Sequence, residues 1–232
     1  MSTLVTSDLH GYALDKFLDL LEKAQFSAAD RLYVIGDVID RNGDGGIAML
    51  RWIMQQNNIT LILGNHEDMM LKCESYFLPD SDPPGTTWDL FEDLMQWDWN
   101  GSDVTVRALS KLDHNSTSEI FHFLRSCPYY KEMNVGGKDF ILVHGGLGNF
   151  APDKPLSNYA PKDLVWHRPT KKEEYFKDKT VILGHTPTKF FGSPDKMFTT
   201  DTWIDIDTGA ADRGGSPMLL RLDDMYEFYV RQ

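Results

Sequence analysis

The sequence predicts an α/β fold that carries a helical segment near its middle, and three observations support this prediction. Strand-like apolar runs alternate with amphipathic helical patterns in the first third of the chain. Residues 72–127 then contain helical patterns, and the last third returns to strand patterns. The 232 residues include 41% hydrophobic and 12% aromatic side chains, which is enough to bury a core and too much for a disordered chain.

The elements of the first third are expected in the order strand, helix, strand, helix, strand. Residues 3–6, 31–35 and 59–63 are short apolar runs, and the second and third of them run into a glycine. Between them, residues 13–24 and 47–54 repeat apolar side chains at helical spacing. Because crossover helices join parallel strands, this order predicts a largely parallel sheet with right-handed crossovers.

The middle of the chain is expected to be helical. Ser116 and Glu119 match a capping box, so one helix is expected to start near Thr117. The helical patterns cover residues 88–99, 104–112 and 118–126. We therefore predict a single domain over residues 1–232, in which residues 72–127 form an inserted helical cap.

The last third is expected to be rich in strands. Gly136-Gly137 separates two apolar runs by two residues, which is a hairpin signal, and Asp223-Asp224 joins the last two runs. The expected strands cover residues 129–135, 138–143, 181–183, 203–206, 218–222 and 225–230.

The charge of the chain restricts its partners. There are 23 Lys and Arg against 35 Asp and Glu, a formal net charge of −12, so we expect no nucleic-acid or membrane partner held by a basic face. Residues 74–103, which include a predicted loop at 79–85, hold eight acids and no Lys or Arg. Cys73 and Cys127 make no disulfide framework, and the N-terminus resembles no secretion signal. We therefore expect a cytoplasmic protein.

Five of the predicted strands end in Asp, His or Asn with a glycine close by. Each such end alone is an ordinary turn, but five in one chain indicate a site, because ligands bind beyond the carboxyl ends of strands in α/β sheets. The five ends are Asp8-Leu9-His10-Gly11, Gly36-Asp37-Val38-Ile39-Asp40-Arg41, Gly64-Asn65-His66-Glu67, His144-Gly145-Gly146 and Gly184-His185-Thr186.

The residue types at these ends indicate metal ions. Carboxylate, imidazole and amide groups suit divalent ions such as Mn, Fe or Zn. The candidate ligands are Asp8, His10, Asp37, Asn65, His144 and His185. Six ligands exceed one tetrahedral site but suit two ions that share a bridging carboxylate, an arrangement used for displacement at phosphorus.

These motifs resemble those of the calcineurin-like metallophosphoesterases, and in particular the compact bacterial and phage-type members of the phosphoprotein phosphatase group. The segment Ile206-Asp207-Thr208-Gly209 is similar to the family's C-terminal part. The resemblance implies a sandwich of two mixed β-sheets flanked by helices. It also implies a metal-dependent phosphoric ester hydrolase with two divalent ions per chain. Manganese is the favoured metal, with Fe, Zn, Ni or Mg as alternatives.

The resemblance also implies a role for each site residue. Asp8 and His10 would bind the first metal, Asp37 would bridge both, and Asn65, His144 and His185 would bind the second. His66 would be the general acid that protonates the leaving group, and Asp40 would orient it. Arg41 and Arg168 would bind the phosphate.

Three positions depart from the family pattern. Leu63 stands where protein phosphatases of this group usually have an arginine, and this form is similar to symmetrical diadenosine tetraphosphate hydrolases. Asn42 replaces a usual glycine, and asparagine tolerates the left-handed turn conformation best among other residues. Pro187 takes the place of a second histidine found in nuclease-like relatives, which favours the phosphoprotein phosphatase branch.

The main hypothesis is therefore a phosphomonoester hydrolase, a serine/threonine-type protein phosphatase that uses a two-metal-activated water, with a phosphorylated protein or a small phosphoester as its substrate. The alternative is a dinucleoside polyphosphate hydrolase, and the remote alternative is a non-catalytic metal-binding regulatory module. Two further interpretations stay open. The aromatic residues Trp88, Phe91, Trp97 and Trp99 form either a core for the helical segment or a substrate platform. The acidic residues at 74–103 would favour phosphate groups set among basic residues.

Overall fold

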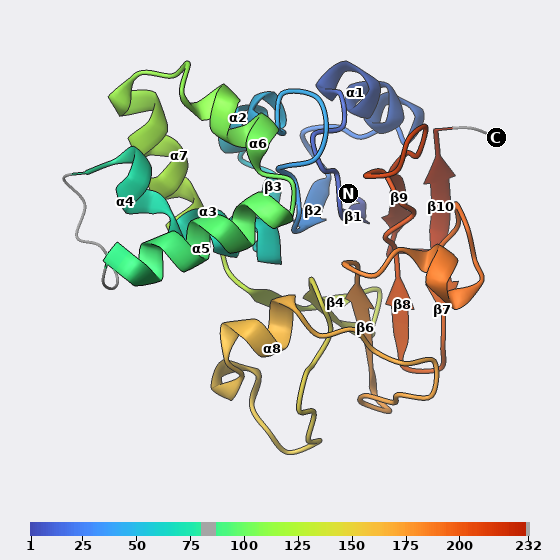
Figure 1. The fold of residues 1–232 in the computed structure, drawn as a ribbon. Coiled ribbons are helices and arrows are strands. Elements are labelled where there is room, and N and C mark those ends of the chain that lie inside the picture. The colour runs from blue at the N-terminus through green and yellow to red at the C-terminus, as the bar shows by residue number, and fades with distance from the viewer. Residues whose placement is uncertain (80–86, 231–232) are drawn as a thin grey trace.

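Two five-stranded β-sheets, packed against each other with helices outside, form the protein in the computed structural model, which describes residues 1–79 and 87–230 (Figure 1). The strand orders are β10-β9-β1-β2-β3 and β4-β5-β6-β8-β7. Both sheets are mixed, because each combines parallel and antiparallel pairs. The predicted fold class, an α/β sandwich of two mixed sheets flanked by helices, is confirmed.

The strands of the first sheet are β1 (Thr3–Thr6), β2 (Arg31–Ile35), β3 (Ile59–Ile62), β9 (Met218–Arg221) and β10 (Tyr226–Tyr229). Those of the second sheet are β4 (Tyr130–Val135), β5 (Lys138–Val143), β6 (Lys179–Leu183), β7 (Phe198–Thr199) and β8 (Trp203–Asp205). The predicted parallel pairing of β1 with β2 and of β2 with β3 is confirmed. So is the hairpin at Gly136-Gly137, where both glycines have positive φ, 58° and 84°.

The helices are α1 (Leu14–Lys23), α2 (Ile47–Met54), α3 (Asn65–Lys72), α4 (Glu74–Phe77), α5 (Thr87–Trp99), α6 (Asp103–Leu109), α7 (His114–Ser126) and α8 (Pro161–Val165). Short 3₁₀ turns lie at Leu156–Asn158 and Thr188–Phe191. Helix α4 lies inside residues 72–127, which were expected to be helical, but outside the three helical patterns there. Helices α3 and α8 were not predicted. The loop expected at 79–85 lies outside the described residues except for Pro79.

The start of α7 differs from the prediction. The helix begins at His114, and Asp113 caps it by accepting a hydrogen bond of 2.7 Å from the Ser116 N–H. The expected capping box at Ser116 and Glu119 was wrong, because an aspartate three residues earlier satisfies the free N–H groups first. Helices α4 to α7 occupy the described residues between 74 and 126, without a strand among them. That residues 72–127 are a cap inserted in one domain stays a prediction.

Alternate residues of the strands enter different layers of the core. Val5 and Ile35 meet Leu142 and Ile182 of the second sheet in the layer between the sheets. Leu4, Leu32 and Val34 point the other way, against α1, α2, α3 and α7. Side chains of a strand alternate between its two faces, so a sheet covered on both sides needs continuous apolar runs. The buried helices therefore fix the outer face of the first sheet and the loops that leave it.

The structure also bears on the two cysteines and on membrane-spanning helices. Cys73 and Cys127 are both free thiols, so neither belongs to a disulfide. No helix within residues 1–79 and 87–230 is long and apolar enough to cross a membrane.

Candidate metal centre and active site

The predicted ligands come together from both sheets at the carboxyl ends of their strands. Asp8 follows β1, Asp37 follows β2, and Asn65 begins α3 directly after β3; His144 follows β5 and His185 follows β6. All six predicted ligands are buried, with at most 5% of each residue exposed. Two groups of side chains have ligand atoms within 4.8 Å of one another: His10, Asp37 and His66, and Asp37, His144 and His185. Asp37 belongs to both groups.

The Asp37 carboxylate is the central anion of this arrangement. Its Oδ2 lies 3.2 Å from Nε2 of His144, 3.5 Å from Nε2 of His10 and 3.8 Å from Nε2 of His66. Its Oδ1 accepts a hydrogen bond of 3.1 Å from the backbone N–H of His66, in the first turn of α3. Burial raises the pKa of Asp37. The imidazoles of His144 and His66 lower it by more than burial raises it, so the net pKa is well below the usual value. Asp37 therefore stays a carboxylate.

The tautomers of two histidines are set by backbone carbonyls. Nδ1 of His10 lies 3.1 Å from the Ile39 carbonyl oxygen, and Nδ1 of His144 lies 2.9 Å from that of Ile35. A carbonyl can only accept, so Nδ1 donates in both residues and the Nε2 atoms face Asp37. This is the usual arrangement of a metal-ligating histidine.

The donor set fits divalent metal ions. If the two imidazoles are neutral, their Nε2 lone pairs face a carboxylate oxygen, which requires a cation or proton between them. In the metal-free protein, a proton on His144 takes this place. Burial lowers the pKa of His144, but the charges of Asp37 and Asp8 outweigh burial and raise the pKa to about 10. The Nε2 atom of His185 is buried and has no hydrogen-bond partner among the described residues. An orphaned buried nitrogen beside a carboxylate is well suited to coordinate a metal.

Asp8 and Asn65 also contact histidines of this arrangement. Asp8 Oδ2 accepts the His185 N–H at 3.0 Å, and its Oδ1 lies 3.8 Å from Nε2 of His10. Asn65 Oδ1 lies 3.1 Å from Nε2 of His144. Asp8 thus lies beside His10, and Asn65 lies beside His144; the division of these residues into two metal sites stays a prediction. The individual ligand roles stay predictions.

His66 lies between a carboxylate and a guanidinium. Its Nδ1 is 2.6 Å from Asp40 Oδ2, and its Nε2 is 3.1 Å from Nη2 of Arg41. Burial lowers the pKa of His66, but the charge of Asp37 and the hydrogen bond to Asp40 raise it more, so its net pKa lies above the usual value. A guanidinium can only donate. Nε2 therefore accepts in this arrangement, so Arg41 must move and Nε2 must take up a proton before it can donate one.

Both predicted phosphate-binding arginines border the centre. Arg41 contacts His66, as described above, and Arg168 donates from Nη1 to the His185 carbonyl oxygen at 2.7 Å and to Thr186 Oγ1 at 3.1 Å. Both side chains are exposed. Each guanidinium has five N–H donors, so both retain donors for a phosphate group.

Backbone strain is concentrated in these loops. The described residues contain ten non-glycine positions with positive φ, and six of them are Asp8, His10, Asp37, Asp40, Arg41 and His185. Each such position costs about 1–3 kcal/mol and persists only where surrounding contacts hold it, typically at functional sites. Asn42 is not among them: Arg41 and Gly43 take the left-handed conformation, at 67° and 56°. The two neighbours of Asn42 therefore take the left-handed conformation, and Asn42 itself does not need it.

Several buried polar residues of the site were not predicted. Glu67 accepts hydrogen bonds from the N–H groups of Asp37 and Val38 at 2.8 Å and of Gly64 at 3.0 Å. Its place in the Gly-Asn-His-Glu motif was a signal that could have identified it. Trp97 and Thr105 donate to Asp40 from 57 and 65 residues away, and no local pattern indicates this.

Two buried carboxyls near the centre were also not assigned. Burial and the charge of Asp8 raise the pKa of Asp207 well above its usual value, and burial and the charge of Asp207 do the same for Asp205. One oxygen of Asp205 has no partner among the described residues, and an unpaired buried oxygen favours the neutral carboxyl over the carboxylate, in agreement with the raised pKa. The family segment at 206–209 contains Asp207 and could have pointed to it.

The remaining histidines lie away from the centre. His114 and His122 are exposed on α7, and His167 pairs with Glu173 at 2.6 Å. Their expected surface or structural roles agree with these positions.

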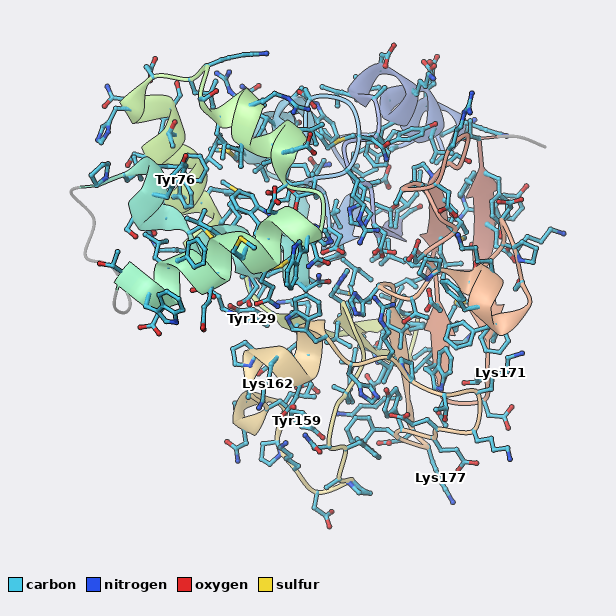
Figure 2. The ribbon with its side chains drawn as sticks, viewed as in Figure 1. Tyr76, Tyr129, Tyr159, Lys162, Lys171 and Lys177 are labelled. Carbon is cyan, nitrogen blue, oxygen red and sulfur yellow. The ribbon has the colours of Figure 1, made fainter. Side chains whose placement is uncertain are left out.

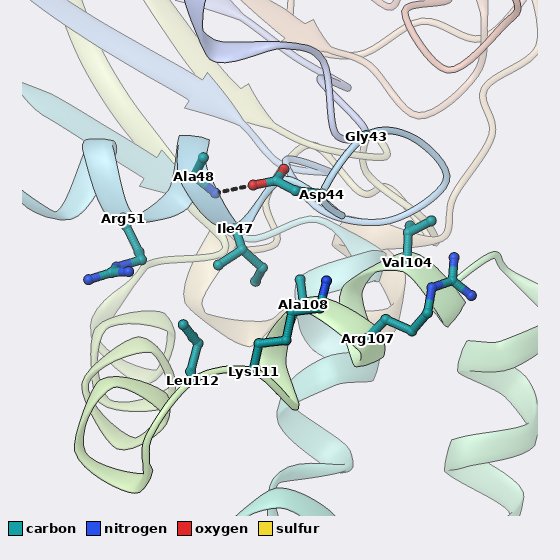
Figure 3. A pocket seen from close by; sticks show the side chains of 10 residues that line it. All are labelled: Gly43, Asp44, Ile47, Ala48, Arg51, Val104, Arg107, Ala108, Lys111 and Leu112. Carbon is teal, nitrogen blue, oxygen red and sulfur yellow. Dashed lines mark hydrogen bonds between the residues drawn. The ribbon is translucent and has the colours of Figure 1, made fainter.

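Two cavities differ in their relation to the predicted site residues. One, of about 480 Å³, is lined by Gln96 of α5, Lys162 of α8, and by Trp166 and His167; Figure 2 labels Lys162 on α8. The Trp166 ring meets the His185 ring edge-on, with 6.0 Å between centroids, so this cavity adjoins the metal centre. The other, of about 350 Å³, lies between α2 and α6 and contains none of the predicted site residues (Figure 3).

The chain resembles named phosphoesterases over much of its length. It is 36% identical to a symmetrical bis(5'-nucleosyl)-tetraphosphatase of Methylobacillus flagellatus, over 99% of this chain and 95% of that protein. It is 39% identical to that of Haemophilus ducreyi over 68% of this chain and 48% of the relative, and 28% identical to that of an Acidovorax species over 63% and 44%. The chain thus spans less than half the length of the latter two relatives.

Solved structures share the fold. A structure assigned as a diadenosine tetraphosphatase superimposes with a TM-score of 0.67 at 14% identity, over 97% of this chain and 90% of the other. A serine/threonine protein phosphatase from Saccharomyces cerevisiae gives 0.57 at 16% identity, over 88% and 66%. At these identities the likeness concerns the fold alone.

The family itself is shown by the sequence. The profile described as calcineurin-like phosphoesterase matches residues 1–206, which include all five strand-end motifs and the metal centre built from them. The chain therefore belongs to the calcineurin-like phosphoesterase family.

Proposed function

We propose that this protein hydrolyses phosphoric esters and anhydrides at the Asp37 centre, and that dinucleoside tetraphosphates are its preferred substrates. The observation that carries the proposal is the Asp37 carboxylate, which two groups of buried ligand atoms share. Calcineurin-like phosphoesterases bind a pair of divalent metal ions. When bound, such ions would activate a water molecule and neutralise charge on the phosphoryl oxygens. We propose manganese as the metal, since the carboxylate and amide oxygens of Asp8, Asp37 and Asn65 are ligands that suit it.

The chain's own residues would divide the remaining work. In this proposal Asp8, His10 and Asp37 hold one ion, and Asp37, Asn65, His144 and His185 hold the other. Arg41 and Arg168 bind the phosphoryl oxygens through paired N–H groups. As Arg41 turns to the substrate it leaves Nε2 of His66. The imidazole, whose pKa is raised, takes up a proton from solvent at Nε2 and then donates it to the leaving oxygen while Asp40 holds Nδ1–H.

Three features support dinucleoside tetraphosphates as the substrate class. The bis(5'-nucleosyl)-tetraphosphatases are the named relatives that match this chain, one of them over nearly its whole length. Leu63, which stands at the position of an arginine in protein phosphatases, is buried and offers no cation to a phosphomonoester. The cavity beside Trp166 has room for the part of a large substrate that lies beyond the cleaved bond.

A serine/threonine protein phosphatase is the second candidate. It is favoured by the motif set around Asp8, Asp37 and His144, by the paired arginines and by Pro187 in place of a second histidine. The acidic residues of 74–103 also suit a phosphate set among basic residues better than a polyanion.

A substrate panel with the manganese-loaded protein tests these assignments. We expect kcat/KM for diadenosine tetraphosphate to exceed that for p-nitrophenyl phosphate and for a phosphoserine peptide by more than about 10-fold. Symmetrical cleavage of a tetraphosphate must yield two nucleoside diphosphates, which chromatography detects. A faster reaction with the peptide would favour the second candidate. Absence of turnover with every substrate would indicate a non-catalytic binding module.

The His66→Asn variant tests the proposed proton donor. We expect it to retain its metal content and to lose kcat on phenyl phosphate by about 10²-fold or more, because the basic phenolate needs a proton as it leaves. The loss on p-nitrophenyl phosphate should be smaller, since nitrophenolate leaves without help. His122→Asn on the exposed face of α7 is the control, with unchanged kcat. Full activity of His66→Asn on phenyl phosphate would contradict the role.

A further inference from the structure

The carboxylate of Asp40 is held by side chains from two helices that lie far from it in sequence. Trp97, on α5, donates its Nε1 proton to Asp40 Oδ2 at 2.7 Å. Thr105, on α6, donates its hydroxyl to Asp40 Oδ1 at 2.5 Å, and the same hydroxyl accepts the backbone N–H of Asp40 at 3.0 Å. All three residues are 0% exposed. Each oxygen of the carboxylate is therefore bound by at least one fixed donor besides His66.

We propose that Trp97 and Thr105 are positioning residues that hold the Asp40 carboxylate and, through it, the imidazole of His66. The inference rests on the proposed role of His66 as proton donor and deepens it. It assigns to α5 and α6 a function in the reaction, whereas the sequence pattern suggested only a local core or a substrate platform for Trp97.

The physical reason is the geometry of a buried carboxylate. Asp40 has His66, Trp97 and Thr105 as its side-chain donors among the described residues. With the imidazole alone, the carboxylate could rotate about its last bond and carry Nδ1 of His66 with it. Donors on both oxygens remove that freedom. A misplacement of about 1 Å can cost about 10²-fold in rate, so the restraint matters even though neither residue reaches the substrate.

Packing alone does not account for these contacts. The Trp97 ring meets the Phe77 ring edge-on, with 6.0 Å between centroids, as in any aromatic core. A residue chosen only to fill this space would need no polar atom, and burying one without a partner would cost free energy. Here the indole N–H and the threonine hydroxyl both end on the same carboxylate.

The test uses the manganese-loaded 232-residue protein and two aryl phosphates that differ in leaving group. Trp97→Phe keeps the aromatic side chain and deletes the indole donor. We expect kcat on phenyl phosphate to fall by about 10-fold or more, the range seen when supporting hydrogen bonds are removed. KM should stay within about twofold, and kcat on p-nitrophenyl phosphate should fall much less. A general loss of folded protein would lower both rates by the same factor.

Matched controls separate positioning from packing. Trp203 is also 0% exposed, and its Nε1 donates at 2.9 Å to the Glu173 carbonyl oxygen, away from Asp40. Trp203→Phe removes the same atoms and should leave the ratio of the two rates unchanged. Thr105→Val, which lacks the hydroxyl, should repeat the Trp97→Phe pattern. Thr105→Ser, which keeps the hydroxyl, should restore the wild-type ratio.

A spectroscopic measurement gives a second readout that needs no turnover. In the metal-free protein, the Nδ1 proton of His66 in its short bond to Asp40 should give a far-downfield proton NMR signal, absent in His66→Asn. Trp97→Phe and Thr105→Val should shift that signal, and Trp203→Phe should not. If neither aryl phosphate is hydrolysed, this signal alone decides.

The outcomes distinguish this inference from the proposed function. If His66→Asn shows the leaving-group effect and Trp97→Phe and Thr105→Val do not, the positioning role is overturned and His66 keeps its role. If His66→Asn itself shows no leaving-group effect, both are overturned. A His66 signal that does not move in either variant also overturns the positioning role.

Discussion

Glu67 connects two strand-end loops through its carboxylate. One oxygen binds the N–H groups of Asp37 and Gly64, and the other binds that of Val38 at 2.8 Å and that of Ile39 at 3.4 Å. Burial and the charge of Asp37 raise the pKa of Glu67. The side chain sets the distance between the Asp37 loop and the first turn of α3, and therefore the spacing of Asp37 and Asn65.

Glu67→Gln is predicted to destabilise the protein. An amide offers one oxygen, so its NH₂ group must face at least one pair of these backbone donors. Leaving buried donors unpaired costs about 1–3 kcal/mol each, so we expect a loss of about 3 kcal/mol in urea unfolding of the metal-free protein. Glu22→Gln on the exposed face of α1 should change stability by less than about 0.5 kcal/mol. A change that small in Glu67→Gln would contradict the structural role.

The ligand residues and their spacing in the chain could be predicted from the sequence, but the orientations and tautomers of the histidine rings could not. Asp8, His10 and His185 were identified because each follows an apolar run and lies beside a glycine. That His10 and His144 turn Nδ1 toward the carbonyls of Ile39 and Ile35 depends on where neighbouring strands end. A local pattern contains no information about which backbone carbonyl lies opposite a ring nitrogen.

The element that constrains the site most closely is the end of β2. Gly36 has φ 74°, and a Cβ added there would lie 2.5 Å from Gly64 Cα and 2.7 Å from Nδ1 of His144. The three loops after β2, β3 and β5 therefore meet at a position where only hydrogen fits. This contact brings Asp37 close to His144.

Replacing Gly36 by alanine separates this close contact from backbone strain. Gly137, in the β4–β5 hairpin, also has positive φ, but nothing lies within 4 Å of an added Cβ. Gly137→Ala should therefore show the strain alone, about 1–2 kcal/mol. Gly36→Ala should lose at least about 2 kcal/mol more and bind manganese more weakly, as measured by urea unfolding and by metal titration. Equal losses in the two variants would show that the steric contact is unimportant.

Helices α5 and α6 show the limit of pattern reading at this scale. Their existence was predicted from apolar spacing, and they lie at Thr87–Trp99 and Asp103–Leu109. Their contact with Asp40 was not predicted, because the 57 residues between Asp40 and Trp97 leave no periodic trace of the pairing.

The formal net charge of −12 counts every Asp and Glu as ionised, but a buried acid with a raised pKa makes the stability of the whole molecule depend on pH. Asp207 is buried, and burial with the charge of Asp8 raises its folded-state pKa well above its usual value. The folded protein therefore binds a proton at Asp207 more tightly than the unfolded chain does. This contribution to stability is fully present below the unfolded pKa of about 3.9 and is lost as the pH rises through the folded pKa.

Asp207→Asn is predicted to gain stability relative to wild type as the pH rises. The amide oxygen can still accept the Gly209 N–H, which Asp207 Oδ1 binds at 2.9 Å, but it carries no charge. Unfolding in chelator should show little difference at pH 4 and an advantage of more than about 1 kcal/mol at pH 7.5, since one pKa unit corresponds to about 1.4 kcal/mol. Asp19→Asn, exposed on α1, should show no such trend. A pH-independent difference for Asp207→Asn would refute the assigned pKa direction.

The sequence by itself determined the alternation of strands and helices, the five strand ends and the family to which they belong. These follow from apolar periodicity and from glycine beside ligand residues, both of which are local properties of the chain. Only the tertiary structure decided that Asp37 lies among three imidazoles, that Arg41 covers Nε2 of His66, and that Trp97 and Thr105 hold Asp40. Such contacts join segments whose separation in the chain is set by loops and helices, and their energies depend on burial that only the folded protein provides.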